Sequence, residues 1–264
     1  MKIGLVQFAP RLADVEGTIA DLSFMENRMQ GADLLVFPEL CNSGYNFESR
    51  EQAIGASEPA SGGPLITYMA DLCRRQNCLA VTGLNERDGG RLYNSAVLIG
   101  PEGIRALYRK IHLFDREKLV FEPGDIPPFV MDIGVCRIGM LVCFDWFFPE
   151  VWRILALRGA DVICHPANLV MPGLAQRGVP LHALLNRVFI VTANRTGRER
   201  DLAFTGTSFI AGPRGEVLAQ AGPEDAAVVI IEIDPALARD KRVNERNDIF
   251  GDRRREMYQD LGML

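Results

Sequence analysis

Short apolar runs alternate with amphipathic segments along most of this chain, and no other feature of the sequence restricts the fold as strongly. Asp14 and Pro64 each begin a segment in which apolar residues recur at helical spacing. The runs before and after these segments are short and apolar, which is typical of buried strands: KIGLVQFA, DLLVFPE and CLAVTGL. We therefore expect an α/β fold in which helices cover layers of strands.

The second half of the chain has the same alternation. The sequence predicts a strand at Cys136–Val142, a helix at Pro149–Arg158 that stops at Gly159, and a further strand at ADVICHP. A last helix and strand are predicted around the apolar positions Leu181, Leu184, Leu185 and Val188 and at FIVTAN. Each half therefore repeats the order of strand and helix.

Two similar hairpins interrupt the alternation. AVLIGPEGIRALYRK turns at Gly100–Gly103, and SFIAGPRGEVLAQAG turns at Gly212–Gly215, each through a G-P-x-G sequence. This favours two halves built on one plan, with helices outside and two sheets stacked inside. No linker or low-complexity segment divides the chain, so we expect residues 1–264 to form one domain.

Composition excludes several classes of protein. The net charge of -5 argues against a nucleic-acid partner, because phosphate contacts need a basic surface. No run approaches the roughly 18 apolar residues of a membrane helix, and the amino end lacks the pattern of a signal peptide, so we expect a cytoplasmic protein that does not bind a membrane. The six cysteines show no C-x-x-C spacing, and neither a zinc site nor a disulfide scaffold is predicted.

One of these cysteines, Cys143, stands where a predicted strand turns toward the helix that begins at Pro149. Such an elbow exposes a side chain at the carboxyl edge of a sheet and leaves backbone N–H groups free to bind an oxyanion. A buried cysteine that acts only as a small apolar side chain is the alternative. A nucleophilic thiol also needs a base or a nearby positive charge.

Candidates for that base lie elsewhere in the chain. A dyad with His112, His165 or His182 is possible, but the sequence around Cys143 lacks the signatures of cysteine proteases. Glu39, by contrast, ends the run DLLVFPE at the same carboxyl edge as Cys143. Lys110 follows the apolar run IRALY, and Glu117 lies in the charged loop after it; each of these three could also be an ordinary surface residue.

These residues together resemble the nitrilase, or carbon-nitrogen hydrolase, superfamily, whose members carry a Glu, a Lys and a Cys in this order. The matching segments are FPEL with Glu39, YRKIHLF with Lys110 and CFDWFFPE with Cys143, and the likeness extends through GADVICHPAN and NRTG to NERNDIFGDRRREMY. The resemblance implies a four-layer α-β-β-α sandwich of the nitrilase type and homodimers of the form αββα–αββα.

The resemblance also implies a reaction. Glu39 accepts the proton of Cys143, the sulfur attacks an amide carbonyl, and Lys110 with the backbone N–H of Phe144 stabilises the developing charge. Ammonia leaves, and water releases a carboxylic acid from the thioester. Glu117 matches a second glutamate that orients substrate and lysine in many members. No metal or organic cofactor is implied.

The substrate is less restricted by the sequence. Branches that hydrolyse N-carbamoyl amino acids often place arginines after the nucleophile, whereas this chain has Phe144, Asp145 and Trp146. An aromatic lining with one acid suits a small aliphatic or neutral amide, although Trp146 could equally be a core residue. Phe144, Trp146 and Asn168 are the expected substrate-binding residues. An aliphatic nitrilase with the same triad, an N-carbamoyl amide hydrolase and a non-enzymatic binding scaffold of the same fold are the alternatives.

The carboxyl-terminal tail, from about residue 235 to residue 264, is expected in a dimer interface. Between Arg239 and Arg255 it holds seven basic and four acidic residues, interleaved with Val243, Ile249 and Phe250. This mixture suits a partner subunit better than nucleic acid, and a solvated helix is the alternative. We expect a homodimer or a larger even assembly that includes the helix after Cys143.

Overall fold

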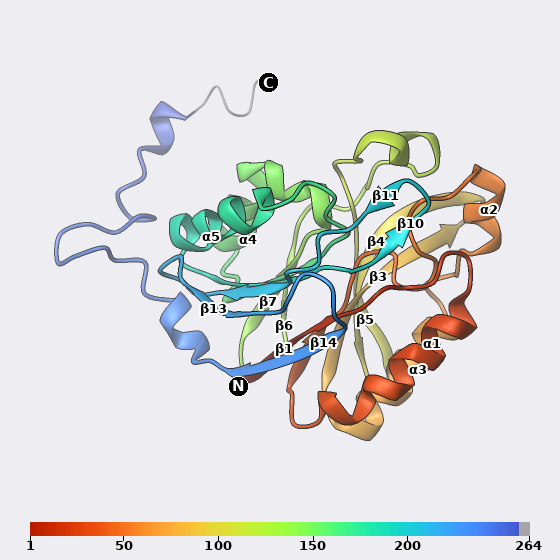
Figure 1. Cartoon of the computed structure of the whole chain (residues 1–264). Coiled ribbons are helices and arrows are strands. Elements are labelled where there is room, and N and C mark those ends of the chain that lie inside the picture. Colours follow the sequence, from red (N-terminus) through yellow and green to blue (C-terminus); the bar gives the residue numbers. More distant parts are fainter. Residues whose placement is uncertain (259–264) are drawn as a thin grey trace.

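The computed structural model describes residues 1–258, and two six-stranded sheets form its centre (Figure 1). The first sheet has the order β14-β1-β2-β3-β4-β5 and consists of Lys2–Gln7 (β1), Leu34–Val36 (β2), Leu79–Asp88 (β3), Arg91–Gly100 (β4), Gly103–Arg109 (β5) and Ala227–Glu232 (β14). The second has the order β13-β12-β9-β8-β7-β6 and consists of Val130–Asp132 (β6), Arg137–Met140 (β7), Val162–Pro166 (β8), Phe189–Ala193 (β9), Phe209–Ala211 (β12) and Val217–Gln220 (β13). Arg198–Glu199 (β10) and Leu202–Ala203 (β11) form a separate short ribbon.

The two sheets have the same internal plan. In each, three consecutive parallel strands are followed by an antiparallel hairpin: β1, β2 and β3 precede β4–β5, and β7, β8 and β9 precede β12–β13. A G-P-x-G turn joins the two strands of each hairpin, and the last glycine of each turn has a positive φ, 104° at Gly103 and 82° at Gly215. The common order supports the prediction of two halves built on one plan.

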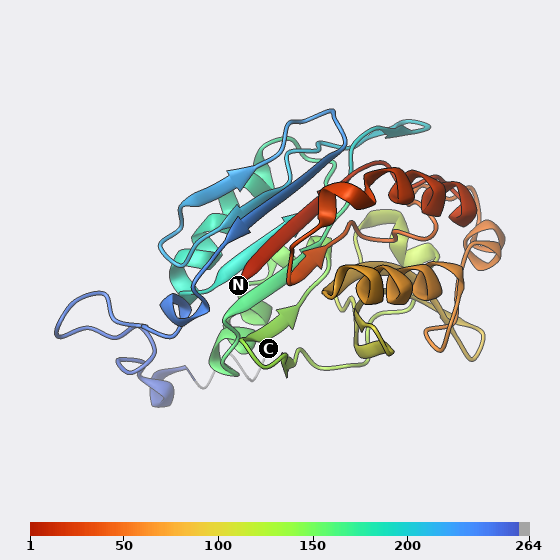
Figure 2. The same cartoon turned by 90° about the horizontal axis from the view of Figure 1, so that it is seen from below.

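Helices cover the outer face of each sheet (Figure 2). Val15–Met25 (α1) and Pro64–Gln76 (α3) lie on the first sheet, and Pro149–Leu157 (α4) and Leu174–Asn186 (α5) lie on the second. Shorter elements are Arg50–Gly55 (α2) and the 3₁₀ turns Glu26–Met29 (η1), Asp115–Leu119 (η2), Cys143–Phe147 (η3), Pro235–Ala238 (η4) and Arg255–Met257 (η5). The predicted α-β-β-α sandwich is confirmed.

The predicted helix starts have the expected causes. The Asp14 carboxylate accepts a hydrogen bond from the Gly17 backbone N–H at 2.9 Å and caps α1. Pro64 and Pro149 each stand in the first turn of a helix, where the missing N–H of proline removes no hydrogen bond.

Two apolar layers hold the sandwich together. Side chains of β1, β2 and β3 that face the second sheet join those of β7, β8 and β9 in one buried cluster, which also contains Trp152 and Leu155 of α4. A second cluster fills the space between the first sheet and α1 and α3. Burial of this apolar surface is the main stabilising contribution.

The leucines of α5 have an unexpected environment. The predicted helix is present, but Leu181 and Leu185 are more than half exposed, while Val179 and Ala183 fill the core. Exposure of a contiguous apolar face to water is unfavourable, and such a face is typical of a surface that contacts another molecule.

Candidate active site

Cys143 lies at a backbone elbow, as the sequence predicts. It is the first residue of η3, three residues beyond β7, and its φ of 41° is in the left-handed region that non-glycine residues rarely adopt. The Cys143 carbonyl accepts a hydrogen bond from Nε2 of His165, 3.1 Å away, and Nδ1 of the same ring lies 3.0 Å from the Thr192 hydroxyl. Since a neutral imidazole has one donor and one acceptor, this histidine is held in the tautomer that protonates Nε2.

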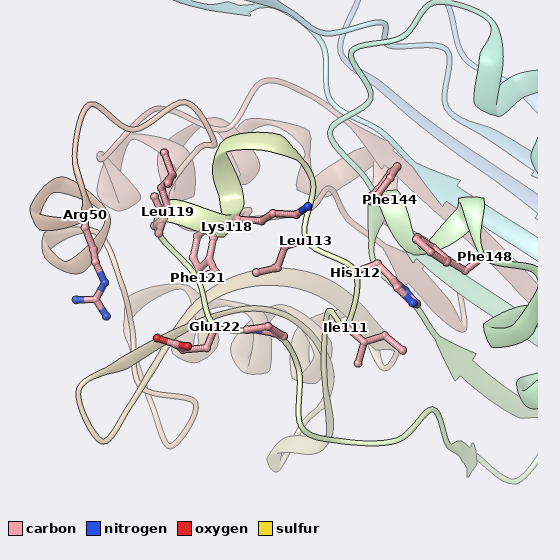
Figure 3. A pocket seen from close by; sticks show the side chains of 12 residues that line it. Arg50, Ile111, His112, Leu113, Lys118, Leu119, Phe121, Glu122, Phe144 and Phe148 are labelled. Atoms are coloured by element: carbon pink, nitrogen blue, oxygen red, sulfur yellow. The ribbon is translucent and has the colours of Figure 1, made fainter. Parts of the chain in front are cut away.

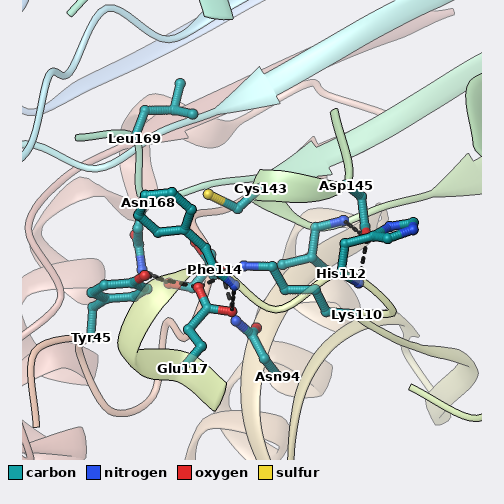
Figure 4. A network of polar contacts seen from close by, with 12 residues as sticks. Tyr45, Asn94, Lys110, His112, Phe114, Glu117, Cys143, Asp145, Asn168 and Leu169 are labelled. Carbon is teal, nitrogen blue, oxygen red and sulfur yellow. Dashed lines mark hydrogen bonds and ion pairs between the residues drawn. The ribbon is translucent and has the colours of Figure 1, made fainter. Parts of the chain in front are cut away.

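Lys110 and two carboxylates form a fully buried cluster beside this elbow (Figure 4). The Lys110 ammonium donates to Oε1 of Glu39 at 2.8 Å and to Oε1 of Glu117 at 2.7 Å. Lys110 directly follows β5, and Glu39 follows β2. The strands between them are paired so that β2 and β5 point in the same direction, and both residues therefore lie at the same edge of the sheet. The structure therefore brings together the four residues that the sequence proposed as catalytic.

Neighbouring polar side chains complete the cluster. Asn94 donates through Nδ2 to Oε1 of Glu39 at 2.6 Å, and the Tyr45 hydroxyl donates to Oε1 of Glu117 at 2.8 Å. The other Glu39 oxygen, Oε2, is buried without a hydrogen-bond partner among residues 1–258. An unpaired buried carboxylate oxygen is costly and marks a position where a proton or a ligand atom can bind.

Burial and mutual charge shift the pKa values of these groups. Burial is the largest influence on the Cys143 thiol and, with the charge of Glu39, raises its pKa well above the ordinary value, so the resting sulfur is protonated. Burial lowers the pKa of Lys110, but the charges of Glu117 and Glu39 outweigh it and raise that pKa. Burial raises the pKa of Glu117 to about 7, against the opposing effect of Lys110.

The expected substrate-binding residues lie in different surroundings. Phe144 is half-buried in an aromatic cluster with Phe114 and Phe148, at centroid distances of 5.0 and 5.5 Å. Trp146 belongs to the main core, where its ring contacts Gly178 so closely that a methyl group there would lie 2.4 Å from it. Asn168 is buried and donates through Nδ2 to the Glu39 backbone carbonyl at 3.1 Å.

Asp145 is not part of an exposed pocket lining, which corrects the sequence interpretation. Its side chain is fully buried and accepts hydrogen bonds from the Tyr108 hydroxyl and the backbone N–H of Val142. The alternation of exposed Phe147 and buried Asp145 follows from the 3₁₀ turn, which the sequence pattern did not predict.

Two cavities flank the loop between Lys110 and Phe121. The larger, about 440 Å³, is lined by His112, Phe144 and Phe148 on one side and by Arg50 and Lys118 on the other (Figure 3). The smaller, about 110 Å³, includes Tyr45 and Glu117 of the polar cluster together with Phe114, Val170 and Leu202. The smaller cavity therefore reaches one catalytic candidate, Glu117, whereas Glu39, Lys110 and Cys143 do not line it.

Sequence reasoning missed Tyr45 and Asn94, and it considered His165 only as a possible base for Cys143. Tyr45 lies six residues after Glu39 and contacts Glu117 across 72 positions, and His165 contacts Cys143 across 22. The run HPAN, which contains His165 and Asn168, was the only local signal, and it gave no indication of the partner of the imidazole.

Neither a metal site nor a membrane-spanning helix is present among the described residues. Within residues 1–258, no group of three or more His, Cys, Asp or Glu side chains is placed to hold a metal ion. No helix in this range is long and apolar enough to cross a bilayer.

Comparison with known proteins gives consistent relatives. A nitrilase of Pyrococcus abyssi (strain GE5 / Orsay) is 48% identical over 98% of this chain and 99% of its own length. An (R)-stereoselective amidase of a Pseudomonas species is 38% identical over 96% of this chain and 92% of its own. A solved structure of a mutant amidase from Nesterenkonia sp. AN1, which shows the result of Michael addition of acrylamide at the active site cysteine, is 28% identical, covers 99% of both chains and superposes with a TM-score of 0.82.

The family model for carbon-nitrogen hydrolases matches residues 2–243. This match, the relatives and the shared architecture confirm the resemblance seen in the motifs around Glu39, Lys110 and Cys143. The chain belongs to the carbon-nitrogen hydrolase family.

Proposed function

We propose that this hydrolase of non-peptide carbon–nitrogen bonds cleaves small primary amides, with Cys143 as nucleophile, Glu39 as general base and Lys110 as the cation that stabilises the oxyanion. The supporting observation is that the two carboxylate oxygens of Glu39 differ in their hydrogen-bond partners. Oε1 is occupied by Lys110 and Asn94, whereas Oε2 is buried without a partner among the described residues. Uptake of the Cys143 proton gives this oxygen the partner that it lacks.

The proton and the charges balance through the cycle. As the sulfur bonds to the amide carbon, its proton passes to Glu39, and the new oxyanion is stabilised by Lys110 and the backbone N–H of Phe144. Glu39 then protonates the amide nitrogen, ammonia leaves, and a thioester remains on Cys143. Water loses a proton to Glu39, attacks the thioester and releases the carboxylic acid and the thiol.

Glu117 has a supporting role in this proposal. It shares the Lys110 ammonium with Glu39 and is held by the Tyr45 hydroxyl, so it fixes the direction in which the ammonium points. A lysine held by two carboxylates stays charged, which the stabilisation of an oxyanion requires.

The substrate class follows from the smaller cavity. Its volume of about 110 Å³ admits an acyl group of a few carbon atoms, and Phe114, Val170 and Leu202 provide apolar contacts. We propose two substrate-binding residues: Phe144, which packs against Phe114 of this cavity, and Asn168, which binds the Glu39 carbonyl. Contact between Trp146 and substrate stays a prediction, because its ring packs in the core.

Ammonia release from a panel of matched amides, nitriles and N-carbamoyl compounds tests the reaction. For one aliphatic pair, kcat/KM for the amide should exceed kcat/KM for the nitrile; the reverse order would make the protein a nitrilase. All six thiols are buried, but only Cys143 has a general base proposed to take up its proton, so iodoacetamide should label Cys143 faster than the other five. Equal labelling of all six, together with no turnover, would favour a binding scaffold.

We also propose a homodimer formed through α4 and α5. Leu181 and Leu185 of α5 and Leu157 of α4 leave an apolar outer face, and the tail reaches this region where Arg153 stacks over Phe250 at 5.0 Å. Residues 259–264 of the predicted interface tail lie outside the described residues. Sedimentation should give a dimer or larger even assembly.

A matched pair of variants tests this interface. Leu181→Glu introduces a charge into the apolar face and should shift the protein toward the monomer. Phe24→Glu, on the exposed side of α1, serves as the control and should leave the assembly unchanged. A wild-type protein that sediments as a monomer at micromolar concentration would refute the proposal.

Two further predictions from the sequence belong to the same proposal. A single domain over residues 1–264 is supported by the family match across residues 2–243 and by the core that both sheets share. A cytoplasmic location is supported by the six free thiols, which suit a reducing compartment. Limited proteolysis tests the first, and cell fractionation tests the second.

A further inference from the structure

Asp145 has a hydrogen-bond environment that the proposed reaction does not explain. Its fully buried carboxylate accepts four hydrogen bonds, two at each oxygen. Oδ2 accepts from the Val142 backbone N–H at 3.0 Å and from the Tyr108 hydroxyl at 2.9 Å. Oδ1 lies 3.1 Å from the backbone N–H of His112 and 2.8 Å from Nδ1 of the same residue (Figure 4).

Three of these four donors belong to the two segments that carry the reacting groups, and the fourth, the Tyr108 hydroxyl, lies on β5. Val142 directly precedes Cys143, and Asp145 itself lies in the same elbow, residues 142–147. His112 lies in the loop between Lys110 and Glu117, and its ring stacks on Phe148 with 3.5 Å between centroids. The carboxylate therefore joins the elbow of the nucleophile to the loop of the second glutamate.

We propose that Asp145 is a positioning residue of the reaction, whose carboxylate holds the Glu117 loop in register with the Cys143 elbow. This inference rests on the proposed function, because it assumes that Lys110, directed by Glu117, stabilises the oxyanion formed at Cys143. In this proposal Asp145 binds neither the substrate nor the sulfur. It acts through the placement of Glu117.

The backbone of Lys110 does not depend on this contact. Its N–H donates to the Asn94 carbonyl and its own carbonyl accepts from the Gly124 N–H, both at 2.8 Å. By contrast, the segment from His112 to Phe114 has side-chain acceptors at both ends: Asp145 for the His112 N–H and Glu117 for the Phe114 N–H. Loss of Asp145 should therefore displace the Glu117 loop while Lys110 stays on its strand.

The requirement for a carboxylate follows from the donors. An asparagine at position 145 must turn its NH₂ group toward one of the two pairs. In either orientation a main-chain N–H, of Val142 or of His112, then faces another donor and loses its acceptor. The isosteric change Asp145→Asn thus removes a hydrogen bond between the Cys143 elbow and the Glu117 loop, or one within the elbow, without creating a cavity.

The experiment compares Asp145→Asn with Asp161→Asn. Asp161 is a second buried carboxylate, which accepts hydrogen bonds from the Arg137 backbone N–H and from Arg239, at the opposite end of the strand that leads to Cys143. We expect Asp145→Asn to lower kcat about a hundredfold with little change in KM, since small misplacements of catalytic groups have effects of this size. Asp161→Asn should keep kcat within about threefold of wild type at a similar loss of Tm. Equal kcat in the two variants would overturn the inference.

A double-mutant cycle with Glu117→Gln distinguishes positioning from a general structural role. If Asp145 acts by placing Glu117, Asp145→Asn should cost less than about threefold in kcat once Glu117 is glutamine. Losses that multiply in the double variant would show that Asp145 does not act through Glu117.

A second variant and a second assay cover the cases in which Asp145→Asn does not fold or no amide is turned over. If Asp145→Asn does not fold, His112→Phe replaces it, because this variant keeps a ring stacked on Phe148 and removes one donor to Asp145. His112→Phe should lower kcat about fivefold in the wild-type background and leave kcat unchanged in the Glu117→Gln background. An equal loss of kcat in both backgrounds would overturn the inference. If no amide is turned over, the proposed function fails. The same cycle is then measured on Cys143 alkylation by iodoacetamide, where independent effects of the two substitutions would refute the role of Asp145.

Discussion

Acid should destabilise this protein through His165, and the structure gives the size of the effect. The imidazole is fully buried between the Cys143 carbonyl and the Thr192 hydroxyl, and burial lowers its pKa from 6.5 to about 4. Above pH 6.5 the histidine is neutral in both the folded and the unfolded chain. As the pH falls below 6.5, the unfolded chain gains a proton that the folded protein does not take up until about pH 4.

The free energy of unfolding therefore decreases as the pH falls through this interval. Each pH unit between the two pKa values is worth about 1.4 kcal/mol, so His165 alone should remove about 3 kcal/mol between pH 6.5 and pH 4. This is a large fraction of the stability of an ordinary domain.

Urea unfolding at a fixed protein concentration, measured at intervals from pH 7 to pH 4, gives the test. The variant His165→Gln keeps one donor and one acceptor but does not titrate. Other titrating groups, including Glu117, are present in both proteins, so their contributions cancel in the difference. The wild type should lose about 3 kcal/mol more than the variant over this range. Parallel pH profiles would show that the folded protein accepts a proton at His165 without cost, and would refute the reasoning.

Three other substitutions have defined expectations. Cys143→Ala should abolish ammonia release and change Tm by less than about 4 °C, because only local packing is lost; activity above a few per cent of wild type would contradict the assignment. The acid limb of kcat/KM should rise with pH through about 7 as Glu117 ionises beside Lys110, and Glu117→Gln should lack this limb; an unchanged profile would exclude Glu117 as its source. Gly83→Ala should lower both kcat and Tm, since the new methyl carbon would lie 2.4 Å from Cα of Glu39 and from the next backbone nitrogen, whereas Gly55→Ala, with open space around it, should be neutral; equal effects would contradict the packing argument.

Local patterns were sufficient for much of the fold. The apolar runs predicted the strands that precede Glu39 and Cys143, and Asp14 and Pro64 predicted the helix starts, because strand burial and helix capping depend on neighbours within a few residues. The 3₁₀ turn at Cys143–Phe147 was missed, since hydrogen bonds to Tyr108 and His112, both distant in sequence, hold it in addition to its local bonds.

The site shows the same division. The motifs around Glu39, Lys110 and Cys143 led to the catalytic candidates, because chemistry restricts which side chains can perform the steps of an amide hydrolysis. Asp145 was misplaced in a substrate lining, because its sequence neighbours are aromatic and its partners, Tyr108 and His112, lie more than thirty residues away.

The sequence by itself determined the order of strands and helices, the elbow at Cys143 and the family to which the chain belongs, since each depends on residue type and short spacing. Only the tertiary structure decided which oxygen of Glu39 lacks a partner among residues 1–258, which side chains hold Glu117, and that Leu181 and Leu185 of α5 face outward. The physical reason is that hydrogen bonds and burial depend on distances of a few tenths of an ångström between segments, and these distances are set when the two sheets pack together.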